Sequence, residues 1–155
     1  MGDFITWENR YSVGIQAIDE QHKRLLELTN TLHEVCLDYG QGHKITKEKF
    51  RKTIQATVNY INVHFSAEEK LLDDSKYPDI VAHKSEHKKF VKKVLENVKQ
   101  FEEGRDFVPS SFVKFLRDWI LEHIAMVDCS YGLYLMHLKK EGKLDENILK
   151  FIENG

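Results

Sequence analysis

The chain has 155 residues, of which 41% are hydrophobic and 31% charged, and its formal net charge is −2 with neutral histidines. This is the size and composition of one globular domain that can bury a core without disulfide bonds. The balanced charge argues against a nucleic-acid partner, and the lack of a run of about 18 apolar residues argues against membrane insertion. Because the start MGDFITWENRY lacks the basic and apolar regions of a secretory signal, we expect a cytoplasmic protein.

The N-terminal arm, residues 1–17, shows no convincing hydrophobic periodicity. Its sequence includes three large aromatic residues, Phe4, Trp7 and Tyr11. We expect an extended segment that lays these side chains over the helices that follow.

Four long amphipathic segments come next, separated by short polar breaks. The breaks contain both prolines of the chain, Pro78 and Pro109, and the pair Gly40 and Gly42, so the segments between them are free to be helical. In each segment, inward-facing residues recur at spacings of three and four. The predicted helices cover Ile18–Tyr39, Lys47–Leu72, Ile80–Glu103 and Ser111 to about Tyr131.

Long helices joined by short loops are typical of an up-down-up-down antiparallel four-helix bundle with its apolar stripes turned inward. The predicted fold class is therefore all-α. We expect a single domain over residues 1–155, with the bundle at about 18–131. The C-terminal extension, residues 132–155, is expected to contain a short helix near Asp145–Glu153 with Asp145 as its N-cap.

Five of the eight histidines lie on the inward stripes, where a hydrophobic core is expected: His22, His64, His83, His87 and His123. A single core histidine is more often a neutral ring bonded to a neighbour than a metal ligand. Five imidazoles with one or two carboxylates carry more donors and acceptors than the helices can satisfy, because helix backbones are already hydrogen-bonded. A metal would take a lone pair from each of these groups.

The spacing of the histidines agrees with metal binding. His83 and His87 are four residues apart, as are His64 and Glu68, so each pair points to one side of its helix with about 6 Å between the two heights. Glu69 turns about 100° away from Glu68, and we expect it to be an ordinary solvated surface residue.

The last pair, His123 and Asp128, is five residues apart, about 140° around an ideal helix. Both can serve one centre if the carboxylate bridges to a second metal or if the helix deforms there. Five imidazoles and two carboxylates exceed the ligands of one ion, so the sequence predicts two metals with Glu68 and Asp128 as bridges. A set without thiolate suits iron or manganese.

These motifs, in this order, resemble the hemerythrin family, in particular the single-domain bacteriohemerythrins. The matching stretches are WENRYSVGIQAIDEQHKRLL, YINVHFSAEEKLL, HKSEHKKF and FLRDWILEHIAMVDCSYG. The resemblance implies a four-helix bundle with two iron ions (Fe²⁺/Fe³⁺) joined by an oxo or hydroxo bridge. It also implies that one iron is bound by His83, His87 and His123 and that the second is bound by His22 and His64. The bridging carboxylates would be Glu68 and Asp128.

Hemerythrins bind dioxygen reversibly, and the resemblance implies that dioxygen is held as a hydroperoxide at the two-histidine iron. Such a pocket must exclude water. Four residues lie next to a ligand or one turn away and could form its dry wall, although each could equally be plain core packing: Phe65, Trp119, Ile120 and Ile124.

The predicted function is therefore an oxygen carrier, store or delivery protein and not an enzyme, and a weak peroxidase-like side activity is compatible with this prediction. A di-iron oxidase or peroxidase is one alternative, but such enzymes on bundles use Glu-rich ligand sets, whereas neutral imidazoles favour stopping at peroxide. An oxygen or redox sensor is another. The expected partners are dioxygen and an oxygen-consuming protein, and we expect a monomer.

Overall fold

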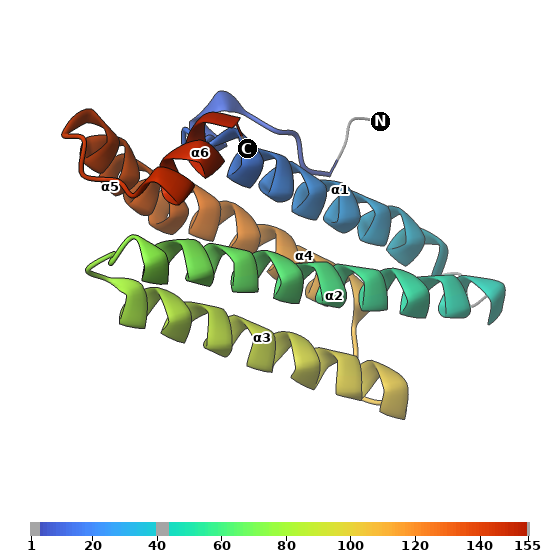
Figure 1. Cartoon of the computed structure of the whole chain (residues 1–155). Coiled ribbons are helices and arrows are strands. Elements are labelled where there is room, and N and C mark those ends of the chain that lie inside the picture. Colours follow the sequence, from blue (N-terminus) through green and yellow to red (C-terminus); the bar gives the residue numbers. More distant parts are fainter. Residues whose placement is uncertain (1–3, 40–43, 155) are drawn as a thin grey trace.

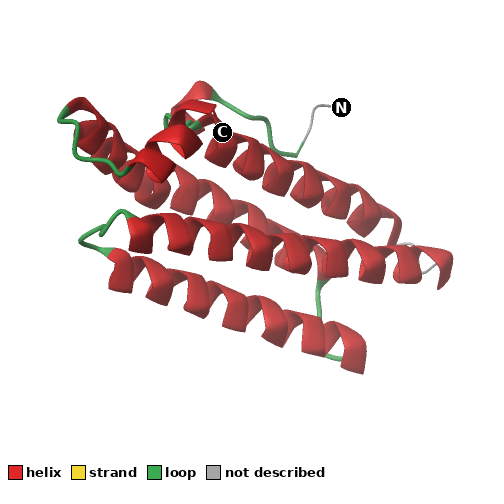
Figure 2. Cartoon of the chain, viewed as in Figure 1, coloured by secondary structure: helices red, strands yellow, loops and turns green. Residues whose placement is uncertain are grey.

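A computed structural model describes residues 4–39 and 44–154, and within these ranges the chain forms helices and loops with no strand (Figure 2). The α-helices are α1 (Gln16–Tyr39), α2 (Lys44–Asp74), α3 (Ile80–Glu103), α4 (Pro109–Glu122), α5 (Cys129–Lys140) and α6 (Glu146–Asn154). A π-helical segment, η2 (His123–Asp128), joins α4 to α5, and a 3-10 turn, η1 (Asn9–Tyr11), precedes α1. The predicted all-α class is confirmed. None of the helices in the described ranges has the length and apolar character needed to cross a bilayer.

The long helices lie side by side in an antiparallel bundle (Figure 1). α1 packs against α2 and α4, α2 packs against α3, and α5 continues from α4 through η2. Two short loops, residues 75–79 and 104–108, reverse the chain between the helices. Gly104 ends α3 with a φ of +69°, and its N–H donates to the carbonyl oxygen of Phe101. Glycine adopts this left-handed conformation without a steric penalty, so the helix can stop there.

The fourth helix is longer than predicted. The sequence indicated an end near Tyr131, but the helix continues through α5 to Lys140. Tyr131 and Leu135 are fully buried, four residues apart on one face, and belong to the same cluster as Ile15. The helix therefore runs on through residues 132–140, which we expected to belong to the C-terminal extension, because this apolar stripe packs against the cluster.

The N-terminal arm lies over the bundle, as predicted. Asn30 of α1 accepts a hydrogen bond from the N–H of Ile5 (2.7 Å) and donates one to the carbonyl oxygen of Ile5 (2.8 Å). Phe4 stacks on His33 with 4.0 Å between the ring centroids. The other two aromatic residues expected on the bundle are buried or half-buried: Tyr11 and Trp7.

The predicted C-terminal helix is present as α6. Oδ1 of Asp145 accepts hydrogen bonds from the backbone N–H groups of Asn147 (2.8 Å) and Ile148 (3.1 Å), which makes Asp145 the N-cap. Ile148 and Ile152 are buried in the same cluster as Tyr131, so α6 closes one end of the bundle.

A layer of polar side chains divides the core into two hydrophobic clusters. The larger cluster includes Ile61, Phe65 and Ile124, and the smaller one includes Ile18 and Tyr131. On the bundle helices, the polar layer falls between these positions. Its members are the predicted ligands, each at most 4% exposed: His22, His64, Glu68, His83, His87, His123 and Asp128. The fold thus places all seven in the interior at one level.

Gly132 of α5 gives a test of how the arm is held. A Cβ at this position would lie 2.3 Å from the carbonyl oxygen of Val13. Since that atom belongs to the backbone, the arm or the helix would have to shift, and Gly132→Ala should lower the free energy of unfolding by about 1–3 kcal/mol. Denaturant unfolding measures the change. Leu133→Ala, at a neighbouring position that is 74% exposed, is the control and should cost less than about 0.5 kcal/mol; equal costs would contradict the close contact.

Candidate metal centre

The polar layer is built from every long helix of the bundle. Its residues come from four places: His22 from α1, His64 and Glu68 from α2, His83 and His87 from α3, and His123 and Asp128 from η2. The structure brings together all seven side chains that the sequence predicted as ligands.

The ligand atoms form two sets that share both carboxylates. Within each set, every residue offers one nitrogen or oxygen that lies within 4.8 Å of those of the others. The three-histidine set contains His83, His87 and His123 with Glu68 and Asp128, and the two-histidine set contains His22 and His64 with the same carboxylates. The two groups contain the same histidines as the two that the family resemblance implied.

Glu68 presents one oxygen to each set. Oε1 lies 2.6 Å from Nε2 of His83 and 3.3 Å from Nε2 of His87. Oε2 lies 3.1 Å from Nε2 of His64 and 3.6 Å from Nε2 of His22. A carboxylate has lone pairs on both oxygens, so this orientation allows it to bind two ions at once.

Asp128, like Glu68, presents one of its oxygens to each ligand set. Oδ1 lies 3.1 Å from Nε2 of His123 and 3.4 Å from Nε2 of His83, whereas Oδ2 lies 3.1 Å from Nε2 of His22. Both carboxylates therefore present one oxygen to each set.

The π-helical segment η2 explains how His123 and Asp128 reach the same centre. In an α-helix, residues five apart point about 140° away from each other. The π-helix has a wider turn, with hydrogen bonds from residue i to i+5, and brings such residues onto one face. Of the two solutions left open by the sequence, the structure shows the deformation of the helix, and Asp128 presents one oxygen to each ligand set.

Burial would raise the pKa of both carboxylates, but the neighbouring imidazoles outweigh this effect. The charge of His64 and hydrogen bonds from the surrounding histidines hold the pKa of Glu68 well below its ordinary value. Burial and the charge of Glu68 raise the pKa of Asp128, and contacts with His123 more than offset them, so this pKa is lowered as well. Both groups are thus anionic at neutral pH and available as ligands.

His22 carries a proton in the metal-free protein. Burial lowers its pKa, but the close contacts of its ring with Asp128 and Glu68 and the negative charges of these carboxylates raise it from 6.5 to about 9. Because a protonated imidazole has no lone pair on Nε2, a metal must displace this proton when it binds.

Several atoms of the seven predicted ligands lack partners that a metal ion would supply. Among the described residues, Nε2 of His22 and both oxygens of Asp128 are buried without a hydrogen bond. Nε2 of His87 and Nε2 of His123 face each other at 3.1 Å. Metal ions would use the lone pairs of these atoms together and remove the cost of burying them unpaired. Imidazole and carboxylate donors without thiolate suit non-haem iron.

Two residues outside the ligand set hold ligands in position. Oε1 of Gln21 accepts a hydrogen bond from Nδ1–H of His64 (2.6 Å), which leaves the lone pair of Nε2 directed at the centre. The hydroxyl of Tyr131 donates to Oε2 of Glu68 (3.1 Å). Burial and the charge of Glu68 raise the pKa of Tyr131 well above its ordinary value, so the phenol remains a donor.

The expectation that Glu69 is a solvated surface residue is wrong. Its Oε1 lies 3.4 Å from Nδ1 of His87, and its side chain is only 28% exposed. The turn of about 100° from Glu68 directs this side chain toward α3. Gln21 follows the same rule beside His22. The only signal in the sequence was that each is a polar residue next to a ligand, and this does not show whether the side chain faces solvent or the neighbouring helix.

A small internal cavity of about 10 Å³ lies beside the polar layer, and it is lined by both histidines of the two-histidine set together with His123 and Asp128. All four residues predicted as its wall also line it: Phe65, Trp119, Ile120 and Ile124. Trp119 stacks on His123 with 4.3 Å between the ring centroids. The cavity is about the size that one water molecule needs.

The remaining histidines lie away from the centre wherever the structure describes them. His33 stacks on Phe4, and the exposed His137 lies 3.0 Å from Glu141. The prediction for His43, a polar loop position, falls outside the described residues.

Selective loss of one metal is the first test of the two sets. Replacing His83 and His87 together with Ala removes two of the three imidazoles from one set only. We expect the protein to keep its helical circular dichroism and to lose about half of its bound metal, as measured by elemental analysis. His33→Ala with His137→Ala is the control and should retain all of it. Complete loss of metal from a folded double variant would contradict separate sets.

The pH dependence of the metal-free protein tests the protonation of His22. A pKa raised from 6.5 to about 9 stabilises the fold fully below pH 6.5, and this contribution is lost as the pH rises through 9. The pKa of His83 is also raised, because contacts with Glu68 outweigh the opposite effect of burial. Deprotonation of His83 therefore adds to the decline in stability. Urea unfolding of the metal-free protein should therefore show falling stability over this range. The metal-loaded protein should not show the decline, and a flat profile without metal would refute the assignment.

Comparisons with known proteins agree with this geometry. Residues 13–129 match the family model described as the hemerythrin HHE cation binding domain. A bacteriohemerythrin from Pseudomonas aeruginosa is 34% identical over 137 residues, covering 88% of this chain and 85% of the relative. One from Methylococcus capsulatus is 32% identical over 129 residues, covering 83% and 94%. The crystal structure of a wild-type hemerythrin is similar with a TM-score of 0.75 at 30% identity, covering 83% of this chain and 95% of that one. The chain therefore belongs to the hemerythrin family.

Proposed function

We propose that this protein binds dioxygen reversibly at a centre of two iron ions held in its polar layer, and that it serves as an oxygen carrier, store or delivery protein. The observation that carries the proposal is the pair of ligand sets that share Glu68 and Asp128 beside a small internal cavity. Membership of the hemerythrin family supports it further.

The unequal ligand sets give the two ions different roles. The three-histidine set would surround one ion with five protein side chains, and the two-histidine set would surround the other with four. The ion on His22 and His64 thus has one protein ligand fewer, on the side where both histidines line the cavity. When bound, the iron pair would supply the electrons and the open position that dioxygen requires.

The cavity wall favours binding over turnover. Apart from the ligands themselves and the indole of Trp119, the residues that line it have hydrocarbon side chains: Leu25, Ile61, Phe65, Phe90, Ile120 and Ile124. Such a wall excludes water and offers few protons, and both would be needed to release oxygen in a reduced form. We infer that the protein is not primarily an oxidase or peroxidase.

Optical cycling tests the function directly. The iron-loaded protein is reduced under anaerobic conditions, exposed to air and then depleted of oxygen, while its visible spectrum is recorded. We expect a colour that appears with oxygen and disappears without it over repeated cycles. His64→Ala should abolish the cycle because the two-histidine set loses a ligand, and His33→Ala should leave it unchanged.

Two results would count against carriage. One irreversible oxidation without recovery would show that oxygen is not released intact. Sustained consumption of peroxide with an added reductant would identify an enzyme instead.

A further inference from the structure

We propose that dioxygen reaches the internal cavity through the groove between α2 and α3, and that the side chain of Phe65 is the gate between them. The identity of the ligand rests on the function proposed above. The route itself rests on the positions of the groove, the cavity and the ring that separates them.

An open groove of about 460 Å³ lies between α2 and α3. Its rim is polar and includes Asn62, Ser66 and Lys92, whereas its deeper part contains Phe65 and His87. These two rings are only 6% and 2% exposed. The groove therefore ends on a pair of buried aromatic rings.

Phe65 lines both this groove and the internal cavity. One side chain thus forms the partition between bulk solvent in the groove and the space beside the two-histidine set. His87 also lines the groove, but it is not among the residues that line the cavity. Displacement of Phe65 is therefore the change that would connect the two spaces.

The contacts of Phe65 allow such a displacement. Its ring stacks on that of His87 with 3.6 Å between centroids and an interplanar angle of 1°. It also meets Phe90 and Trp119 at 6.0 and 5.9 Å. These are aromatic contacts without hydrogen bonds, whereas His87 would be fixed by its metal. Of the two stacked rings, that of Phe65 is the one that no metal would hold, so we assign the displacement to it.

The chemistry of this path selects small neutral molecules. The groove is also lined by the apolar side chains of Val91 and Leu95, and its deeper part contains the stacked rings of Phe65 and His87. A hydrated anion would have to lose its water shell to pass between aromatic faces, whereas dioxygen has no such shell to lose. The gate would therefore admit dioxygen and still keep the cavity dry.

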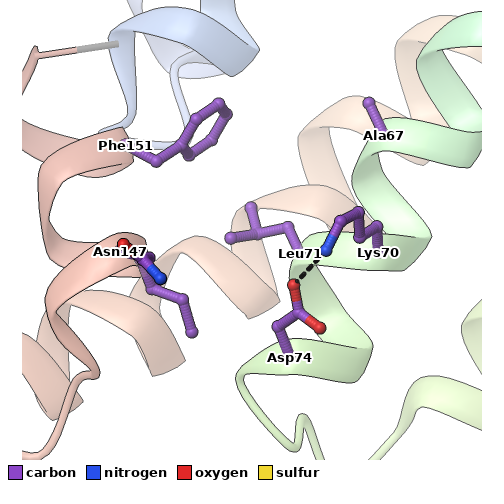
Figure 3. Close-up of a pocket in the computed structure, with 7 residues that line it drawn as sticks. Ala67, Lys70, Leu71, Asp74, Asn147 and Phe151 are labelled. Carbon is purple, nitrogen blue, oxygen red and sulfur yellow. Dashed lines mark hydrogen bonds and ion pairs between the residues drawn. The ribbon is translucent and has the colours of Figure 1, made fainter.

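A second groove, between α2 and α6, supplies a matched control (Figure 3). It has a volume of about 270 Å³, and Ala67, Leu71 and Phe151 are among its lining residues. None of the residues that line it lines the internal cavity. Ser66 and Ala67 are neighbours on α2, both exposed, yet each lines a different groove.

The first experiment blocks each groove from outside and measures dioxygen association and dissociation by stopped flow. Ser66→Phe should slow both rates by about tenfold, the effect of adding one aromatic contact to the barrier, and leave their ratio unchanged. Ala67→Phe should change neither rate. Phe65→Leu, which keeps a buried hydrocarbon but removes the stacked ring, should accelerate both rates by a similar factor.

A second readout does not depend on oxygen binding to iron. In a Trp7→Phe background, Trp119 is the remaining tryptophan and lies on the cavity wall. Quenching of its fluorescence by dissolved dioxygen in the diferric protein reports how often oxygen enters the cavity. Ser66→Phe should reduce this quenching, Phe65→Leu should increase it, and Ala67→Phe should leave it unchanged.

The two readouts separate the route from the proposed function. If oxygen never binds reversibly but the quenching follows the expected order, the function fails and the route stands. The route is overturned if Ser66→Phe leaves both rates and quenching unchanged, or if Ala67→Phe has the same effect as Ser66→Phe. If Phe65→Leu does not fold, the comparison of Ser66→Phe with Ala67→Phe, both at exposed positions, still tests the route.

Discussion

The sharing of two buried carboxylates among five imidazoles is the interaction on which the rest of the structure depends. A buried charge without partners costs several kcal/mol, so Glu68 and Asp128 can lie at the centre of the bundle only while ligand nitrogens from all the long helices surround them. That requirement fixes the spacing and rotation of the helices at the level of the polar layer. The two hydrophobic clusters on either side hold the helices at that spacing. In the metal-free protein, the proton on His22 offsets part of the same negative charge.

The helical spacing in the sequence was sufficient to predict the bundle and to find all seven polar residues at the centre. Histidines at helical spacing with a carboxylate four residues away define a face without any knowledge of the neighbouring helices. The end of the fourth helix was misplaced because the pattern after Tyr131 mixes buried and exposed apolar residues. Leu135 is fully buried, whereas Leu133 is 74% exposed, and only packing distinguishes them. Packing also decides the form of η2. The spacing of five between His123 and Asp128 allowed either a deformed helix or a bridging carboxylate, and the sequence alone could not distinguish them.

The residues that orient the ligands were harder to predict, for a physical reason. A side chain about 100° away from a ligand on the same helix faces either solvent or the adjacent helix, and the outcome depends on how the two helices are rotated against each other. Gln21 and Glu69 both face an adjacent helix and contact an imidazole there. Cavity volume has the same dependence on packing, because a few rotamers decide whether the space beside the two-histidine set is filled.

The π-helical turn η2 also constrains the length of the chain. Because one wide turn replaces an ordinary one, every residue after Asp128 is rotated relative to the continuation of a regular α-helix. The wide turn takes up one extra residue, so α5 can keep Tyr131 and Leu135 on their buried face. Met126, within the turn, is 68% exposed and contributes little to the core. Packing therefore constrains the identity of Met126 little, whereas the number of residues between His123 and Tyr131 determines which side chains α5 turns inward.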